Sequence, residues 1–141
     1  MIPKNKIPLF LQIPAPDYPR AYVTRIMAVD AVITLIGLFI ATMPFAMGWY
    51  PGAFDTTVHV AVGVLIAVLG AFRVLLAYGS SWIEIVLIPL GIIVFRLPHF
   101  MHHEGWDARY TNTHMAAGAI VIIAAIISGL MTTVEMKKTA H

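Results

Sequence analysis

Apolar residues form four long runs, separated by short segments rich in glycine, proline, aromatic and polar residues. The runs cover roughly residues 22–46, 56–78, 82–97 and 112–134. Each is close to the ~20 residues that a helix needs to cross a hydrocarbon core, although the third is shorter and is interrupted by Pro89. Short links force neighbouring helices to run antiparallel. The pattern therefore predicts an all-α, integral membrane four-helix bundle with both ends on one side.

The first 20 residues differ from the runs, because they contain five prolines with apolar residues between them. Repeated proline blocks both helix and central strand, so residues 1–21 are predicted to form an extended Pro-rich arm held against a partner surface. A disordered tail is the alternative interpretation. The remaining organisation is a first transmembrane hairpin at 22–78, a second at 79–136 and a basic tail at 137–141.

The two hairpins are related by an internal repeat. Segment 55–63 recurs 55 residues later as segment 110–118, with four identities in nine positions. The matched residues are Thr56, His59, Ala61 and Gly63 with Thr111, His114, Ala116 and Gly118. Further upstream, at an offset of 54, Gly37, Pro44 and acidic Asp30 match Gly91, Pro98 and acidic Glu84. Two diverged copies of one hairpin should place His59 and His114 at the same outer level of the bundle.

Composition strengthens the membrane prediction. Of the 141 residues, 60% are hydrophobic and 11% are charged, whereas a soluble domain has about 25% charged residues. The absence of cysteine excludes disulfides, zinc–thiolate sites and iron–sulfur clusters. Basic residues are scattered without a stripe, so nucleic acid is not an expected partner.

Lysine and arginine set the expected orientation in the membrane. Seven of the nine lie towards the termini and the link between the second and third runs, and only Arg96 and Arg109 lie towards the other side. This excess predicts cytoplasmic termini in a bacterial inner membrane, with the loops Met47–Asp55 and His99–Tyr110 outside.

The duplicated hairpin resembles the SPW-repeat family of small bacterial four-helix membrane proteins. The resemblance lies in Gly37 to Pro44 followed by a turn and Gly63, and again in Gly91 to Pro98 followed by Gly118. It covers roughly residues 26–131, although only the proline of the signature triplet survives, in segments 43–45 and 97–99. The resemblance implies a two-hairpin membrane fold and gives no role to the histidines.

His59 and His114 are the first candidate site. Each has a glycine four residues later on the same helical face, Gly63 or Gly118, which leaves room for a flat macrocycle or for a close helix. Imidazole is a common haem ligand, so the pair could bind one b-type haem between them. The alternative is structural, because duplication copies residues and glycine is common where membrane helices touch.

A second candidate site lies in the outer loop. His99, His102 and His103 with Glu104 offer imidazole and carboxylate ligands suited to copper or zinc. The spacing matches no well-known template, and a polar loop touching lipid headgroups or a partner explains the same residues.

Asp30, Arg73 and Glu84 should lie at similar depth near the cytoplasmic helix ends. We interpret them as a structural clasp, in which an acid neutralises the arginine. A proton path is the rival interpretation, but no chain of further acids continues across the membrane. Small residues of the fourth run, Ala116 to Gly129, predict a helix-packing surface.

The sequence contains none of the familiar catalytic signatures, such as a phosphate-binding glycine loop or a metalloprotease motif, so no catalytic residues are assigned. The leading hypothesis is an accessory scaffolding subunit of a larger respiratory or photosynthetic membrane complex, with other membrane subunits and lipid as partners. The alternatives are an electron-transfer subunit with haem b and an outer copper or zinc site.

Overall fold

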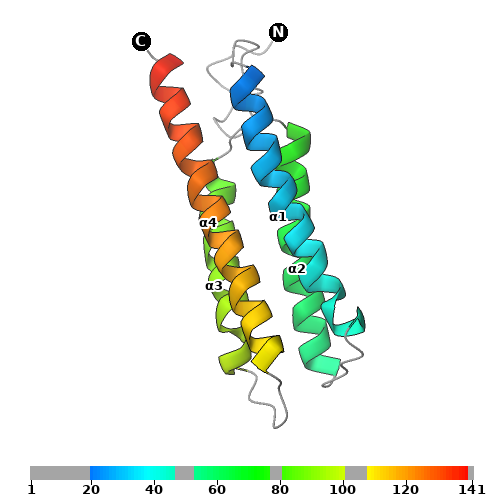
Figure 1. The fold of residues 1–141 in the computed structure, drawn as a ribbon. Helices are drawn as coiled ribbons and strands as arrows, with labels where there is room; N and C mark the ends of the chain where they lie inside the picture. Colours follow the sequence, from blue (N-terminus) through cyan, green and yellow to red (C-terminus); the bar gives the residue numbers. More distant parts are fainter. Residues whose placement is uncertain (1–19, 47–52, 77–80, 101–107, 140–141) are drawn as a thin grey trace.

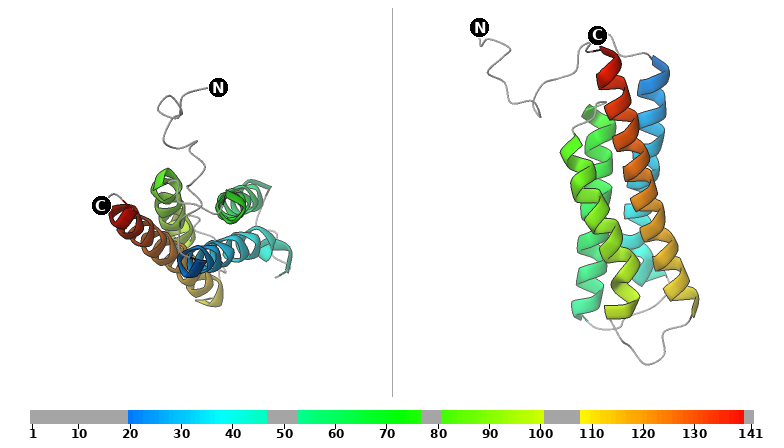
Figure 2. Two further views of the ribbon diagram at one scale, coloured as in Figure 1. Left: turned by 90° about the horizontal axis from the view of Figure 1, so that it is seen from above. Right: turned by 90° about the vertical axis from the view of Figure 1, so that its left-hand side faces the viewer.

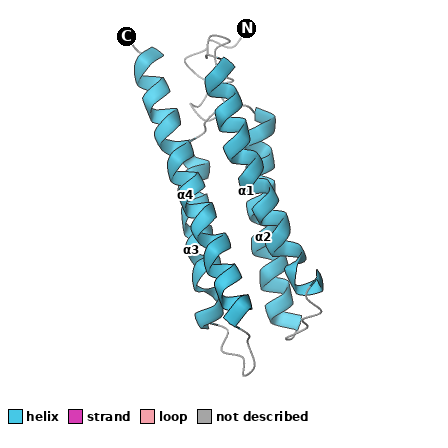
Figure 3. Cartoon of the chain, in the orientation of Figure 1, coloured by secondary structure: helices cyan, strands magenta, loops and turns pink. Residues whose placement is uncertain are grey.

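The computed structural model of the chain describes four helices, α1 (Arg20–Ala46), α2 (Ala53–Leu76), α3 (Ser81–Phe100) and α4 (Ala108–Thr139). Their side chains are described over residues 20–46, 56–74, 82–100 and 108–134. Each helix is long and apolar enough to cross a membrane, and the described residues contain helix without strand (Figure 3). The predicted all-α membrane bundle with four spans is confirmed.

The helices form two antiparallel hairpins that lie side by side (Figure 1). α1 packs along α2, and α3 packs along α4; the hairpins then meet mainly through α1 and α4. α1 begins and α4 ends at the same end of the bundle, where both extend beyond α2 and α3 (Figure 2). We call this the terminal end, and the opposite end the loop end.

Helix boundaries differ from the sequence prediction in the second hairpin. α3 continues through Pro89 and Pro98 to Phe100, so Pro89 does not interrupt it, and His99 is helical rather than part of a loop. Membrane helices tolerate proline because neighbouring groups compensate for the lost backbone bond. α4 begins at Ala108, which also makes Arg109 and Tyr110 helical. The proline arm lies outside the described residues.

The repeated glycines are the points where the two helices of each hairpin come closest. A Cβ atom added at Gly37 would lie 2.8 Å from the carbonyl oxygen of Gly63, and one added at Gly63 would lie 2.8 Å from that of Gly37. Gly118 and Gly91 show the same reciprocal contact, at 2.7 and 3.1 Å. Only glycine permits this backbone approach, because any side chain would fill the space.

The bundle interior is apolar over its middle and polar towards both ends. Its core contains buried isoleucine, leucine, valine and alanine from all four helices, including Ile33, Ile66, Leu87 and Val121. Many large apolar side chains face outward instead, among them Leu35, Ile85 and Leu130. An outer surface of this kind suits hydrocarbon, in which exposed apolar groups carry no hydration cost.

Candidate functional site

His59 and His114 meet inside the bundle near the loop end. His59 is the seventh residue of α2 and His114 the seventh of α4, so the repeat places them at the same height. Both are fully buried. Their ring centroids lie 4.9 Å apart with an interplanar angle of 89°, an edge-to-face arrangement. The contact joins α2 to α4, one from each hairpin.

Tyr110 completes this cluster. Its hydroxyl forms a hydrogen bond with Nε2 of His59, and its ring centroid lies 4.0 Å from that of His114. His114 Nδ1 donates to the backbone carbonyl oxygen of Tyr110 at 3.0 Å, one turn earlier in α4. Because a carbonyl only accepts, this bond fixes which ring nitrogen of a neutral His114 carries the proton. Each of the three side chains thus contacts the other two.

A haem ligated by both histidines would have to lie between the two rings. The edge-to-face contact leaves no such gap, and the Tyr110 hydroxyl sits at His59 Nε2. The spaces beside Gly63 and Gly118 are filled by the backbones of α1 and α3. Of the two uses that the sequence suggested for these glycines, the structure shows the close helix. This packing does not fit a haem held between the rings.

A second buried polar cluster lies towards the terminal end and takes one residue from each helix. Nε of Arg73 on α2 lies 3.2 Å from Oδ1 of Asp30 on α1, and Nη1 of Arg73 pairs with Oε1 of Glu84 on α3. Nη2 of Arg73 donates to Oγ of Ser128 on α4 at 2.6 Å. The guanidinium is 1% exposed. The clasp predicted from the sequence therefore forms, and it holds all four helices.

Hydroxyl groups extend this cluster towards the terminal end. Thr132 Oγ1 donates to the backbone carbonyl oxygen of Ser128 at 2.9 Å, one turn earlier on α4. Tyr22, at the start of α1, donates to Thr132 Oγ1 at 3.4 Å. A line of polar groups thus runs from the first turn of α1 to the buried guanidinium.

The predicted metal site is described only in part. His99 lies at the end of α3 and is exposed, whereas His102, His103 and Glu104 lie outside the described residues. Among the side chains that the structure describes, no group of three metal-binding residues comes together. The copper or zinc site stays a prediction.

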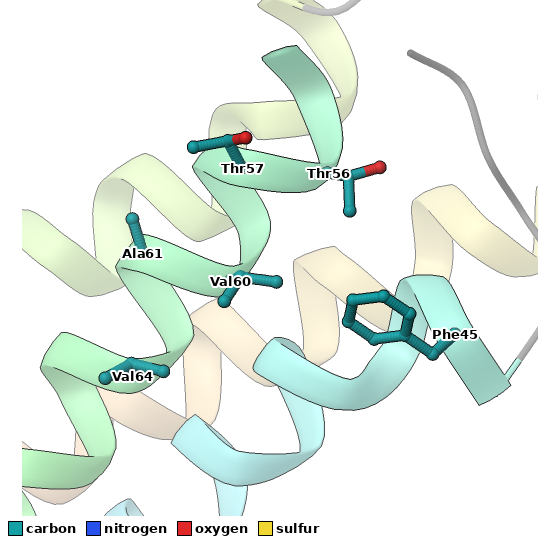
Figure 4. Close-up of a pocket in the computed structure, with 6 residues that line it drawn as sticks. All are labelled: Phe45, Thr56, Thr57, Val60, Ala61 and Val64. Atoms are coloured by element: carbon teal, nitrogen blue, oxygen red, sulfur yellow. The ribbon is translucent and has the colours of Figure 1, made fainter. Parts of the chain in front are cut away.

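An open groove of about 440 Å³ lies on the outside of the first hairpin near the loop end. Phe45 on α1 faces Thr56 and Val60 on α2 across it, and Thr57, Ala61 and Val64 complete its lining (Figure 4). Two threonine hydroxyls are its only polar side-chain groups, so its lining offers no acid, base or metal ligand.

A comparison with protein families finds a match to the SPW repeat domain over residues 27–128. This match covers most of the chain, from the first third of α1 to the last third of α4. The chain belongs to the SPW-repeat family. No curated protein and no solved structure matches it significantly. The SPW assignment agrees with the resemblance that the glycine and proline positions indicated. The four glycines form one close contact in each SPW hairpin, Gly37 with Gly63 and Gly91 with Gly118.

Ser128 and Tyr110 are partners in these clusters that the sequence analysis does not predict. Ser128 was predicted only as a small packing residue, yet it stands 55 residues after Arg73 and is therefore its repeat equivalent. The 55-residue offset of the repeat is the sequence signal that points from Arg73 to Ser128. Tyr110 falls in the predicted loop His99–Tyr110, and its repeat equivalent is Asp55. No signal in the SPW repeat pointed to its contact with His59.

Proposed function

We propose that this SPW-repeat protein is an accessory, scaffolding subunit of a larger respiratory or photosynthetic membrane complex, without catalytic activity of its own. The observation that supports this most is where the buried polar groups lie. In the described part of the bundle they are Asp30, His59, Arg73, Glu84, His114, Ser128 and Thr132. All of them belong to the two clusters that join helices, so these polar groups point into the bundle and away from its outer surface.

The outward surface supports the same proposal. Less than half of each candidate span is buried within the chain, and the exposed remainder is largely apolar. Such a surface can contact lipid or the apolar helices of other membrane subunits. A bundle that directs its polar groups inward and an apolar surface outward is suited to packing between other subunits.

The experiment is native separation of membranes that contain the tagged full chain, solubilised in a mild detergent. The proposal expects co-migration with a respiratory or photosynthetic complex, identified by its own activity and pigments, at a fixed stoichiometry. Deleting the gene should reduce assembly of that complex. A chain that migrates alone, with every such complex unaltered in the deletion strain, would contradict the proposal.

We propose further that the protein lies in a bacterial inner membrane with its terminal end in the cytoplasm, as the lysine and arginine distribution indicates. Because the chain has no cysteine, single-cysteine variants report orientation cleanly. A membrane-impermeant maleimide applied to intact spheroplasts should label Gly105→Cys and leave His141→Cys unlabelled until lysis. The reverse labelling would overturn the orientation.

A b-type haem at His59 and His114 is the alternative function. The observation that favours it is that the two imidazoles meet, buried, at one level. It requires the rings to separate and the Tyr110 hydroxyl to leave His59. A reduced-minus-oxidised visible spectrum of the purified full chain tests it: a haem band abolished by His59→Ala supports the alternative, and the absence of any band rejects it.

A copper or zinc site at His99, His102, His103 and Glu104 remains the third hypothesis. Its support is the ligand chemistry of the sequence alone. Elemental analysis of the purified chain tests this hypothesis. Copper or zinc in a stoichiometric amount, lost in the double variant His102→Ala/His103→Ala, would support the site. Metal content below stoichiometry in the unmodified chain rejects it.

A further inference from the structure

The Arg73 cluster holds two acids and one base inside a membrane-spanning bundle. Asp30, Arg73 and Glu84 are 0%, 1% and 5% exposed. With all three ionised, the cluster would carry one positive and two negative charges. An uncompensated charge is costly in the low-dielectric interior of a bundle, and groups in that position usually neutralise instead.

The contacts leave acceptor atoms unused on both acids. Arg73 engages Oδ1 of Asp30 and Oε1 of Glu84, and it directs its remaining terminal nitrogen to Ser128. The second oxygens, Oδ2 of Asp30 and Oε2 of Glu84, are buried without a hydrogen-bond partner among the described residues. A buried carboxylate oxygen of this kind lacks the donors that normally stabilise its charge.

The SPW repeat relates the four residues of the cluster as two equivalent pairs. Asp30 and Glu84 are equivalent residues of the two hairpins, and so are Arg73 and Ser128. A symmetric pair of hairpins with arginine at both positions would hold two acids and two bases. Ser128 contacts Arg73 through a neutral hydroxyl, so the described side chains of the cluster include two acids and one base.

We propose that the cluster is a binding site for one proton, held by the Asp30–Glu84 pair and exchanged with the terminal side of the membrane. Among the described residues, Arg73 from α2 pairs with both acids, and the neutral hydroxyl of Ser128 from α4 contacts Arg73. The hydroxyls of Thr132 and Tyr22 connect the cluster to the terminal end. Towards the loop end, the apolar core with Ile33, Ile66 and Leu87 separates it from the histidine pair.

Infrared spectroscopy of the full chain in lipid nanodiscs at neutral pH tests the proposal directly. The unmodified protein should show the C=O stretch of one protonated carboxylic acid, shifted in heavy water. The band should disappear in Asp30→Asn and equally in Glu84→Gln, because the remaining carboxylate then balances Arg73. Ser128→Ala is the matched control, since it removes a contact of Arg73 without changing the charge count, and it should keep the band.

Stability against pH gives a second measurement that does not depend on assigning a band. A free Asp or Glu is ionised above about pH 5, so the unfolded chain would bind one proton fewer than the folded chain. Stability should therefore fall as pH rises, with the unfolding equilibrium constant increasing up to about tenfold per pH unit. Glu84→Gln should remove this dependence relative to the unmodified protein.

Three results would overturn the proposal. The first is an unmodified protein with no protonated-carboxyl band and a pH dependence equal to that of Glu84→Gln. The second is a band that survives in both single variants, which would assign the proton to another group. The third is stabilisation by sodium over potassium at constant ionic strength without a band, which would assign the missing charge to a metal cation.

Discussion

At the scale of single residues, the arginine on α2 joins the two hairpins through its side chain. Arg73 contacts a residue from each of the other three helices, and its guanidinium is buried at the level where α2 ends and α3 begins. A buried ion pair contributes modestly to stability when compared with apolar residues, but breaking one leaves an uncompensated buried charge. Arg73 should accordingly be far less tolerant of substitution than the exposed Arg96.

Arg73→Met should destabilise the folded bundle by about 3–5 kcal/mol, because it leaves Asp30 and Glu84 without their cation. Reversible unfolding in mixed detergent micelles, followed by circular dichroism, measures the free energy. Adding Asp30→Asn and Glu84→Gln to Arg73→Met should recover much of the loss. If Arg73→Met alone were as stable as the unmodified protein, Arg73 would not be needed to compensate the two buried acids.

Gly118→Ala should cost about 1–3 kcal/mol, since the new Cβ would lie 2.5 Å from the backbone nitrogen of Phe95 and 2.7 Å from Gly91 O. Gly129→Ala, also on α4, is the control. Its Cβ would meet Glu84 Cγ at 3.5 Å, an ordinary contact, so the change should stay within about 0.5 kcal/mol. Equal effects at the two glycines, measured by the same unfolding assay, would argue against close packing at Gly118.

At the scale of helices, sequence reasoning succeeded where a run of residues carries the information. The four spans follow from long apolar runs, and the helix pairing follows from short links. The rotation of each helix about its axis is harder to predict, because spans that are apolar on every side carry almost no amphipathic signal. The buried positions of Asp30, His59, Arg73 and Glu84 supply that signal here.

Two helix features could not have been predicted from the sequence. Pro89 was expected to interrupt α3, but proline breaks a helix less often in a membrane bundle than in water. The Tyr110–His59 bond depends on α4 beginning at Ala108, before the apolar run, and on how the two hairpins are apposed. The residues near Tyr110 indicate neither where α4 begins nor how the two hairpins pack together.

Pro89→Ala should leave the helical content unchanged and should not destabilise the bundle. α3 continues through this exposed position, and the substitution restores a backbone N–H donor. Leu87→Ala, two residues earlier and fully buried, should cost about 2–5 kcal/mol. Far-UV circular dichroism and detergent unfolding give both values; loss of helix in Pro89→Ala would show that α3 depends on the proline.

At the scale of the whole molecule, the repeat relates α1 to α3 and α2 to α4. Residues at equivalent positions meet inside the bundle, His59 with His114 near the loop end and Asp30 with Glu84 through Arg73 towards the terminal end. Equivalent glycines close each hairpin between these levels. The protein is thus two copies of one hairpin, folded together so that the copied polar residues face each other.

The most direct test of this arrangement is cysteine cross-linking between α2 and α4 in a chain that has no cysteine of its own. His59→Cys/His114→Cys, treated with a short bifunctional thiol reagent, should cross-link within one chain. Cyanogen bromide cleaves after every methionine, and it should then leave fragment 48–101, which carries residue 59, joined to fragment 102–115, which carries residue 114. Leu65→Cys/Ile120→Cys, equivalent positions that are 45% and 41% exposed, should stay unlinked. Efficient linkage of the exposed pair with none between residues 59 and 114 would contradict the account.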